Sequence, residues 1–403
     1  MAGSEEAREE RALTRWVRTK EELVRLSESL AGASALALDT ESDSLHHHVE
    51  KVCLIQLATE RGEACLVDPL ALRDLSALAP IMADPGLAKV LHGADYDVTT
   101  LKRDFGFRFA GLFDTMIAAR FLGRPQVGLQ AVAQAELGVT LSKESQRDDW
   151  SRRPLTRTQE QYALADVCHL LLLQTRLAGE LKQLGRLSWV EEESDAVAAL
   201  EPARRRRDAE AYQKVKGARR LSRRQLAVLR EVHLWREELA ETTDVPAFKL
   251  LSSEALLDIA ARAPRTTAEL APVRGLSPRV RSRTEQLLAA VGRALDLPEA
   301  ELPLISPPPP RPVVSEAVRK RIERLRAWRT QAATRLAVDI SVVLPQRLLE
   351  RLAQASPRDV DSLREIEGFR RWRVEAFGPE LLGVIELGGA SGAPPRPPLA
   401  PRE

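Results

Sequence analysis

The sequence predicts an α/β domain over residues 13–200, followed by two small all-α domains over residues 215–298 and 313–387. In the first half, strand-like apolar runs precede alternating helices, which is typical of an α/β domain. The second half has helical periodicity and repeats itself at an offset of 93 residues, which indicates two copies of one unit. Charge divides the halves as well: residues 1–200 carry 23 basic and 31 acidic side chains, whereas residues 201–403 carry 37 and 27.

The elements of the first domain follow from apolar spacing and turn residues. Residues 14–31 have the periodicity of a helix, and a strand follows at 35–41. The turn Arg61-Gly62 separates two more strand-like runs and predicts a hairpin. The remaining expected elements are hairpin strands at 51–58 and 64–67, a short buried strand at 88–91, and helices at 75–83, 95–105, 114–121, 130–137 and 160–181.

The second half begins with a basic connector, Arg204–Arg224, and then repeats. Between the copies, the proline-rich stretch 299–312 predicts a stiff linker. Residues 388–403 are rich in Gly, Pro and Ala and predict a disordered tail. The anchors of the duplication, each 93 residues apart, are Trp235-Arg236 with Trp328-Arg329, Pro264 with Pro357, Leu270 with Leu363, and Gly275 with Gly368.

Composition narrows the class of protein. An acidic half joined to a basic half suggests a catalytic or metal-binding part next to a part that binds a polyanion. Fifty of the 60 basic residues are arginine, which suits phosphate contacts, although genome composition can produce the same bias. Three cysteines without a C-x-x-C pair argue against a disulfide or zinc framework. Without a long apolar run or a secretory signal, we expect a cytoplasmic protein that does not contact membranes.

The strand at 35–41 ends in two acids. Asp39 and Glu41 are two residues apart, so both side chains project from the same face of the strand. Two like charges about 6–7 Å apart repel each other unless a positive group lies between them. A hard divalent cation such as Mg²⁺ is the simplest such group. The alternative is that the two acids lie at a strand end without binding a metal ion.

Further acids lie at two predicted helices. Asp95 and Asp97 stand in the first turn after a short buried strand, where one can cap the helix and the other can bind metal. Tyr162 and Asp166 are one turn apart on one face of an otherwise apolar helix. Four carboxylates can hold two cations about 4 Å apart, the arrangement for in-line phosphoryl displacement. Tyr162 could then orient the attacking water or accept its proton.

These motifs resemble those of a known family. Asp39-Thr-Glu41, His92–Asp97 and Tyr162–Asp166 resemble the three exonuclease motifs of the DEDD superfamily, in the subgroup whose third motif is Y-x-x-x-D. The segment Leu141–Leu155 resembles the corresponding segment of the ribonuclease D family. The duplicated units resemble the helicase-and-ribonuclease-D C-terminal (HRDC) domain. The match covers roughly residues 14–386 in the domain order of bacterial ribonuclease D.

The resemblance implies a ribonuclease-H-like nuclease domain that acts as a 3′→5′ exoribonuclease and releases nucleoside 5′-monophosphates. It implies that Asp39, Glu41, Asp97 and Asp166 hold two divalent ions, Mg²⁺ or Mn²⁺, and that Tyr162 positions the water. Asp97 is preferred to Asp95 because its spacing matches the family motif. One departure is Ser42, where many members carry an aromatic residue, and this puts in doubt how a terminal base would stack.

Other residues are candidates for RNA contact. Lys143, Gln146, Trp150 and Arg153 precede the third motif and are expected to contact substrate, although Trp150 can equally belong to the core. In the helical units, the arginines are either phosphate contacts or a solvated helix face, and the paired tryptophans Trp235 and Trp328 are expected in the core. These arginines are Arg219, Arg220, Arg223 and Arg224 in the first copy and Arg370, Arg371 and Arg373 in the second.

The remaining polar motifs receive structural interpretations. His46-His-His48 is expected in a polar loop near the site entrance, because consecutive histidines point in different directions. We expect His92 to form a structural hydrogen bond and Asp114 to cap the following helix. Asp43 is expected to be a solvated neighbour of the acids.

The expected partner is therefore RNA, as tRNA precursors or other structured RNA with a single-stranded 3′ end, bound by a monomer. Two alternatives remain at this point. One is a DNA-directed 3′→5′ exonuclease of the same superfamily, because the chemistry does not use the 2′-hydroxyl. The other is a non-catalytic RNA-binding adaptor, against which the complete set of acids and Tyr162 argue.

Overall fold

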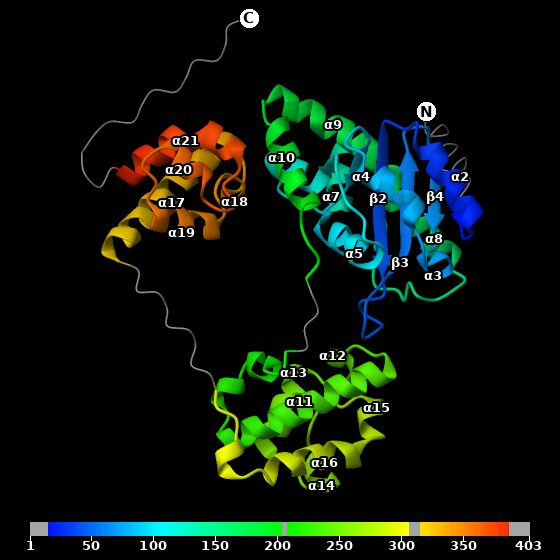
Figure 1. Cartoon of the computed structure of the whole chain (residues 1–403), viewed down its shortest axis with the longest axis vertical. Helices are drawn as coiled ribbons and strands as arrows, with labels where there is room; N and C mark the ends of the chain where they lie inside the picture. The colour runs from blue at the N-terminus through cyan, green and yellow to red at the C-terminus, as the bar shows by residue number, and fades with distance from the viewer. Residues whose placement is uncertain (1–14, 204–207, 306–314, 387–403) are drawn as a thin grey trace, which may run out of the picture.

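The computed structural model describes residues 15–203, 208–305 and 315–386. These ranges form an N-terminal α/β domain, a first helical unit (208–305) and a second helical unit (315–386), as Figure 1 shows. Residues 1–12, the arginines 204–207 of the predicted connector, residues 306–312 of the predicted linker and the predicted tail from 388 onward lie outside the described residues. Within the described ranges, no helix combines the length and apolarity that a membrane crossing needs.

The N-terminal domain is built on a mixed six-stranded sheet. Its strands are β1 (Arg15–Val17), β2 (Ala35–Ser42), β3 (Val52–Thr59), β4 (Ala64–Val67), β5 (Ala88–Leu91) and β6 (Leu112–Asp114). Their order across the sheet is β1-β4-β3-β2-β5-β6. Strand β2 runs antiparallel to β3 and parallel to β5, and β3 and β4 form the predicted hairpin.

Helices cover both faces of this sheet. They are α2 (Lys20–Leu30), α3 (Pro69–Leu72), the 3-10 turn η2 (Ser76–Leu78), α4 (Ala79–Ala83), α5 (Asp95–Phe105), α6 (Thr115–Phe121), α7 (Leu129–Leu137), α8 (Arg157–Cys168), α9 (Leu170–Gln183) and α10 (Leu187–Ala198). Leu36 and Leu38 of β2 pack in one core with α2 and α5. Ala37 belongs to the opposite core, with α9 and part of α8. Asp39 and Glu41 therefore point toward α8, because alternate residues of a strand share a face.

Several elements differ from the prediction, among them the helices α3 and α10, which were not predicted. The predicted helix 14–31 begins as strand β1, which pairs with β4, and the helix starts only after the capping box at Thr19. The predicted helix 160–181 is two helices, because the chain turns at His169, whose N–H bonds the carbonyl of Val167. Strand β6 was missed, because three residues are too short to show a period.

The two helical units repeat one another in structure as well as in sequence. At an offset of 93 residues, α11 matches α17, α12 matches α18, and α13 matches α19. The bounds are α11 (Arg223–Thr243), α12 (Ala247–Leu250), α13 (Ser253–Arg262), α17 (Glu316–Leu336), α18 (Ile340–Val343) and α19 (Gln346–Ala355). The left-handed backbone at Asp244 and Ala263 recurs at Ala337 and Ser356, with all four φ angles between 47° and 52°.

The units differ near their ends. The first contains two helices, α15 (Pro278–Arg281) and α16 (Thr284–Leu295), where the second has one helix, α21 (Arg371–Glu386). Each unit also has a short helix before this region, α14 (Thr267–Leu270) or α20 (Val360–Arg364). The first unit adds the 3-10 turns η3 (Ala211–Lys214), η4 (Ala218–Arg220) and η5 (Glu299–Glu301).

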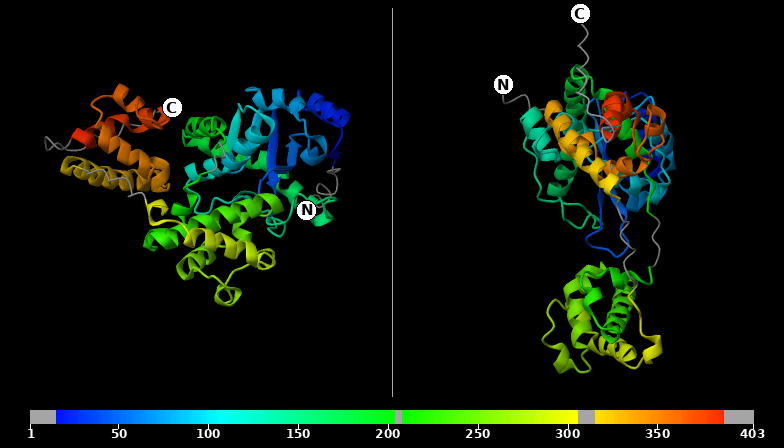
Figure 2. Two further views of the ribbon diagram at one scale, coloured as in Figure 1. Left: turned by 60° about the horizontal axis from the view of Figure 1, so that its bottom comes forward. Right: turned by 90° about the vertical axis from the view of Figure 1, so that its left-hand side faces the viewer.

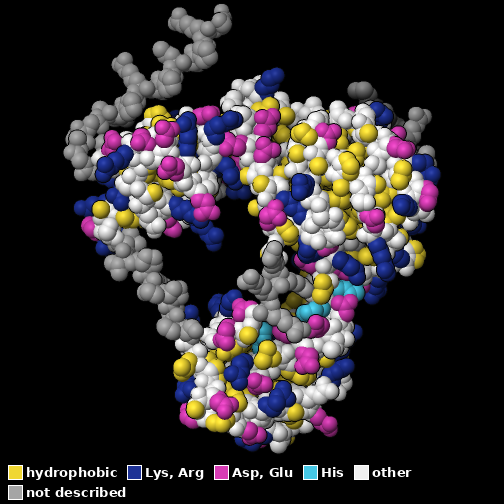
Figure 3. Space-filling model, in the orientation of Figure 1, with side chains coloured by type: hydrophobic (Ala, Val, Ile, Leu, Met, Phe, Trp, Pro, Cys, Tyr) yellow, Lys and Arg dark blue, Asp and Glu magenta, His cyan; other side chains and the backbone are white. Residues whose placement is uncertain are grey.

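The units also meet the N-terminal domain differently. The second unit shares one continuous hydrophobic core with α6, α9 and α10. The first unit has a hydrophobic core of its own and stands apart below the N-terminal domain in Figure 1 and in the right-hand view of Figure 2. A polar contact between this unit and that domain joins Asp244 to the loop at His47 and His48. Histidine side chains, cyan in Figure 3, are visible at this junction.

Candidate active site

Three predicted acids meet where β2 faces α8. Asp39, Glu41 and Asp166 each place a carboxylate oxygen so that the three oxygens lie within 4.8 Å of one another. Asp39 and Glu41 come from one face of β2, and Asp166 comes from the third turn of α8. Residues more than 120 positions apart in the sequence thus form one cluster of the kind that could hold a metal ion.

Asp97 joins this cluster from the first turn of α5. It is only 7% exposed, and its carboxylate accepts a hydrogen bond from the Thr40 hydroxyl, between the two acids of β2. It lies close enough to Asp39 that the Asp39 charge, after burial, raises its pKa. Asp95, two residues earlier, is exposed. The structure places Asp97, and not Asp95, beside the other acids.

The helix that carries Asp97 is positioned by another acid. Asp114 accepts hydrogen bonds from the N–H groups of Gly93 and Ala94, just before α5, at 3.0 and 2.9 Å. It also caps α6 by accepting from Met116 and Ile117. Asp114 is therefore a cap, as predicted, and it holds the starts of two helices together. Asp95 does not cap α5, which begins without a side-chain cap.

The electrostatics of the cluster favour a cation. Burial, followed by the charge of Asp166, raises the pKa of Asp39, and burial raises the pKa of Asp166. Burial and then Asp39 raise the pKa of Glu41 most strongly of the three. Burial thus destabilises the charged form of each carboxylate, and like charges add to this at Asp39 and Glu41. A divalent ion bound among them would remove both penalties, so the donor set fits a metal of the Mg²⁺ type.

Tyr162 lies one turn before Asp166 on α8 and forms a hydrogen bond with that carboxylate. Its ring packs against Trp150 with centroids 6.0 Å apart. Burial, Asp166 and Glu41 raise the pKa of the Tyr162 phenol above its usual value of 10. The phenol is therefore protonated at neutral pH, which suits it to donate a hydrogen bond rather than to accept a proton.

The candidates between residues 143 and 153 divide into two groups. Lys143 and Gln146 are exposed. Trp150 is 1% exposed and packs beneath Tyr162. The guanidinium of Arg153 is held by Asp68, at 2.7 and 2.9 Å, and by backbone carbonyls. Substrate contact by these four residues stays a prediction, but Trp150 and Arg153 have structural partners that occupy them.

The side chains of His46, His47 and His92 each form polar contacts within the protein. His47 Nδ1 is 2.6 Å from Asp244 Oδ2, and its Nε2 is 2.9 Å from Ser151 Oγ. His46 Nε2 contacts the carbonyl of Arg147. His92 Nδ1 is 2.9 Å from Thr115 Oγ1, which is the structural hydrogen bond expected for it. The 46–48 loop therefore links the first helical unit to the segment before α8.

Asp43 is not the solvated neighbour that the sequence suggested. It is fully buried, and its carboxylate accepts a hydrogen bond from the Lys51 N–H at 2.8 Å and lies 3.5 Å from Lys51 Nζ. These contacts close the 43–51 loop. The bulge between Glu41 and Ser42 redirects the chain here, which a pattern of alternating residues does not reveal.

Sequence reasoning missed two residues near the cluster. Gln56 pairs directly with Asp39 across β2 and β3, so it shares the acidic face of the sheet. It is fully buried, and its side-chain amide has no hydrogen-bond partner among the described residues. The signal was one polar residue within the apolar run Val52–Ala58. Asp148 is the second, because its charge contributes to the raised pKa of Glu41.

The helical-unit arginines singled out above are mostly engaged within the protein. Arg223 and Arg224 bond carbonyls near Glu299, at the far end of the first unit. Arg370 and Arg373 of the second unit pair with Glu193 of the N-terminal domain. Arg219 and Arg220 are exposed. Both paired tryptophans, Trp235 and Trp328, are buried as predicted.

Comparison with protein families assigns both parts of the chain. The sequence profile of the 3'-5' exonuclease family matches residues 14–182, and that of the HRDC domain matches residues 225–291 and 318–385. Ribonuclease D of Pseudomonas paraeruginosa is 33% identical to this chain over 374 residues, which cover 92% of this chain and 97% of that relative.

Solved structures of related proteins are also similar to this chain. Escherichia coli RNase D, described as an exoribonuclease involved in structured RNA processing, is 28% identical with a TM-score of 0.64, over 93% of this chain and 99% of that one. The catalytic core of RRP6 from Trypanosoma brucei is 30% identical with a TM-score of 0.65, over 72% and 82% of the two chains. The predicted fold class, a ribonuclease-H-like domain followed by helical domains, is confirmed.

Proposed function

This chain belongs to the ribonuclease D family of 3′→5′ exoribonucleases, and we propose that it trims the 3′ ends of tRNA precursors and other structured RNAs. The observation that carries the proposal is the convergence of Asp39, Glu41 and Asp166 within 4.8 Å, with Asp97 beside them. A family member that had lost catalysis would have no reason to keep four buried or half-buried carboxylates whose charges repel one another.

The four acids are proposed to hold two divalent ions, Mg²⁺ or Mn²⁺. When bound, such ions make water a stronger nucleophile and stabilise the charge on the leaving 3′-oxygen. The charge of Asp166 raises the pKa of Asp39, and the charge of Asp39 raises the pKa of Asp97, so Asp39 lies near both and is the candidate for a ligand shared by both ions. Thr40 fixes the rotamer of Asp97 through its hydroxyl.

Tyr162 is proposed to position the attacking water. Its phenol is bonded to Asp166 and supported from beneath by Trp150, so its oxygen is fixed beside the acids. Because the phenol stays protonated at neutral pH, it orients the water by donating a hydrogen bond. Release of nucleoside 5′-monophosphates, a monomeric state and a cytoplasmic location stay predictions of this proposal.

The test compares two neighbouring acids. Asp97→Asn should lower the rate of 3′ shortening of a 5′-labelled RNA by at least about 100-fold, because a charged group that acts on the reaction is lost. Asp95→Asn is the matched control: it makes the same chemical change two residues away on the exposed side of α5, and its rate should equal that of the unaltered chain.

Three further measurements accompany this comparison: removal of the metal, a DNA substrate, and RNA binding. Chelation of divalent ions should stop the reaction, and a DNA strand of the same sequence shows whether the sugar matters. RNA binding should survive Asp97→Asn. Endonucleolytic fragments, or equal activity in the Asp97 and Asp95 variants, would contradict the proposal.

A further inference from the structure

One pair of equivalent residues approaches the N-terminal domain in both helical units. In the second unit, this is the left-handed residue Ala337, whose carbonyl approaches Gly123 so closely that a Cβ there would collide with it. In the first unit, the equivalent residue is Asp244, which contacts His47. We define a face of each unit by this residue, the short helix α12 or α18 and the chain after Gly275 or Gly368.

In the second unit this face is used for docking. Trp372 stacks on Trp189 of α10 with ring centroids 4.6 Å apart. Arg373 pairs with Glu193 at 2.7 Å. The hydroxyl of Ser341, in α18, accepts a hydrogen bond from Arg120 of α6. The N-terminal domain therefore occupies this face of the second unit.

In the first unit two of these three positions are exposed, and the third, Val280, is buried in the unit's own core. Arg279 stands where the second unit has Trp372, and Phe248 stands where it has Ser341. Arg279 is exposed, and the Phe248 side chain is 56% exposed although it is aromatic. The two regions adjoin, because Leu251 after α12 forms a bridge with Leu276 before α15.

The charge of the segment around Gly275 differs from that of the matching segment around Gly368. Residues 265–283 of the first unit contain five arginines and one acidic residue. The matching residues 358–376 contain five arginines and five acidic residues. The first copy has thus kept its basic charge without the acids that neutralise it in the second.

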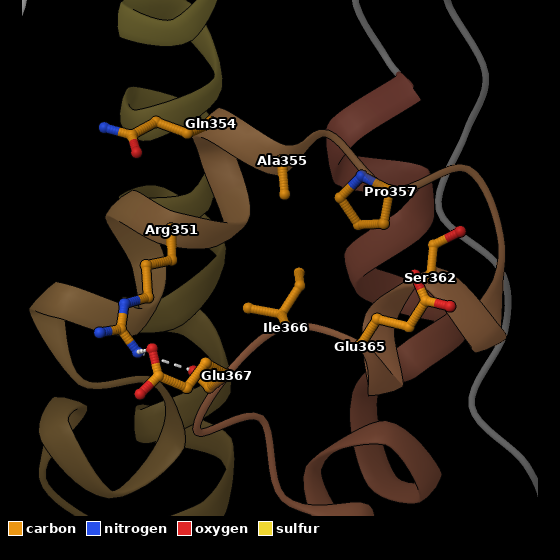
Figure 4. A pocket seen from close by; sticks show the side chains of 8 residues that line it. All are labelled: Arg351, Gln354, Ala355, Pro357, Ser362, Glu365, Ile366 and Glu367. Atoms are coloured by element: carbon orange, nitrogen blue, oxygen red, sulfur yellow. Dashed lines mark hydrogen bonds and ion pairs between the residues drawn. The ribbon is translucent and has the colours of Figure 1, made fainter.

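Figure 4 shows one of those neutralising pairs. Glu367, at the position of Arg274, lies 3.1 Å from Arg351, and the two flank a shallow pocket of the second unit. In the first unit the position of Arg351 is taken by Asp258, but Asp258 is paired with Arg262 at 2.6 Å. Arg274 therefore faces solvent with its charge uncompensated by this neighbour.

Four arginines of this face have no carboxylate partner within the described parts of the chain. Arg281 and Arg283 donate to backbone carbonyls of their own turn. Arg274 and Arg279 have exposed side chains that form no ion pair among the residues described. Unpaired arginines beside an exposed ring are a combination that suits the phosphates and unpaired bases of a nucleic acid.

We propose that this open face of the first helical unit, defined by Phe248, Arg274, Arg279, Arg281 and Arg283, binds the phosphate backbone of the RNA whose 3′ end lies in the acid cluster. The inference rests on the proposed function and assigns the RNA-holding role to one copy of the duplication. A protein partner fits less well, because the face is strongly basic and presents a single large apolar side chain.

A series of contacts leads from Asp244, close in sequence to α12, to the acids. Asp244, three residues before α12, contacts His47, and the neighbouring His46 contacts the carbonyl of Arg147. Asp148 follows, close enough to Glu41 to raise its pKa. RNA held on the face would therefore lie beside the segment that borders the active site.

The test is the triple variant Arg274→Ala, Arg279→Ala and Arg281→Ala in the full chain. The matched control is Arg326→Ala, Arg347→Ala and Arg358→Ala, which removes the same charge from three exposed arginines of the second unit that form no ion pair among the described residues. Each enzyme is given two RNAs: a hairpin with a single-stranded 3′ tail, and a single-stranded oligomer too short to leave the N-terminal domain.

The open-face variant should raise KM for the hairpin RNA about 10-fold at moderate salt. It should also reduce the slope of log KM against log salt concentration by about 3, which is about 1 for each phosphate contact that is lost. Its activity on the short oligomer should match that of the unaltered chain, as should the activity of the control variant on both RNAs. Unchanged melting temperatures would show that both variants fold.

The outcomes separate two failures. If the unaltered chain shortens neither RNA, the proposed function fails. If it shortens both and the open-face variant behaves like the control variant, the function stands and the assignment of this face is overturned. An equal loss on both RNAs also overturns it, because the arginines would then act at the site rather than on the RNA body.

Discussion

The two helical units are copies of one pattern, with matching helices and left-handed turns 93 residues apart, yet only one of them shares a hydrophobic core with the N-terminal domain among the described residues. The second unit merges its core with that of the N-terminal domain. The first keeps a separate core and meets the loop at His47 through Asp244. Duplication therefore supplied two equivalent faces, and substitution at a few positions gave them different uses.

The difference lies in side chains rather than in the backbone. At one equivalent position the docked unit has Trp372 and the open unit has Arg279. Both units keep the arginine after their paired tryptophan, and this arginine makes the same internal contact. Arg236 bonds the carbonyl of Leu251, and Arg329 bonds that of Leu344. Residues that hold the unit together are thus retained, whereas residues on the face have diverged.

The largest expected effect is the loss of the aromatic anchor. Trp372→Ala should destabilise the protein by about 3–5 kcal/mol, because a buried tryptophan stacked on Trp189 is replaced by a cavity. Arg279→Ala, at the equivalent position of the first unit, should change stability by less than about 0.5 kcal/mol, because this side chain is exposed. Denaturant unfolding checks both, and similar losses would contradict the contrast between the units.

The second-largest expected effect is that a divalent metal ion stabilises one helical unit and not the other against thermal unfolding. Scanning calorimetry should show two transitions: one for the N-terminal domain together with the docked second unit, and one for the first unit. Added Mn²⁺ should stabilise only the former, by about 2.7 kcal/mol at a hundredfold excess over its Kd. A shift in both transitions would mean that the first unit is also part of the docked body.

The same experiment has a defined pH dependence. The pKa values of Asp39 and Asp166 are raised from 3.8 to about 7 in the folded chain. Between these values the folded state binds more protons than the unfolded state, so without metal this cluster lowers stability as the pH rises from about 4 to about 7. The stabilisation by Mn²⁺ should therefore be larger at pH 8 than at pH 5, and Asp39→Asn should reduce the difference.

A smaller effect is expected at the ion pair of the docked face. Glu193→Ala leaves Arg373 buried without its carboxylate, which should destabilise the protein by about 2 kcal/mol. The cost stays below that of Trp372→Ala because Arg373 keeps its bonds to the carbonyls of Val342 and Val343. Glu375→Ala removes an exposed acid from α21, the helix that carries Arg373, and as the control it should be nearly neutral. Calorimetry should show the second unit loosening only in the Glu193 variant.

How much of this could be predicted from sequence depends on the range of the interactions. The acids at 39 and 41 share a face because a strand alternates, and Tyr162 and Asp166 share one because a helix turns, so local spacing was enough to propose them. The duplication was visible because its anchors keep a constant offset. Convergence of the two pairs on one cluster depends on the packing of α8 over β2.

The sequence could not show which charged side chains already form ion pairs within the protein. Arg370–Arg373 has the composition of a phosphate site, but Arg370 and Arg373 pair with Glu193, about 180 positions away, and Arg371 pairs with Glu375. Trp150 and Arg153 lie in the motif segment, yet one is core and the other holds Asp68. The arginines of the open face are inconspicuous in the sequence because they are spread over ten residues, and only the fold shows which carboxylates they lack.

The smallest expected effect tests the polar contact of Asp244 with the N-terminal domain. Asp244→Ala removes the carboxylate that accepts from His47 and from the His48 N–H. Because this carboxylate is more than half exposed, the loss in stability should stay below about 1 kcal/mol. Small-angle scattering should nevertheless show a larger radius of gyration, since this contact joins the unit to the loop.

Val245→Ala is the control. Val245 lies next to Asp244 and packs against the unit's own core, so its loss should lower the stability of the unit without changing the distance between the domains. An unchanged radius after Asp244→Ala would mean that the first unit is held by more than this joint, and the contrast between a docked and an open copy would then be weaker than the contacts indicate.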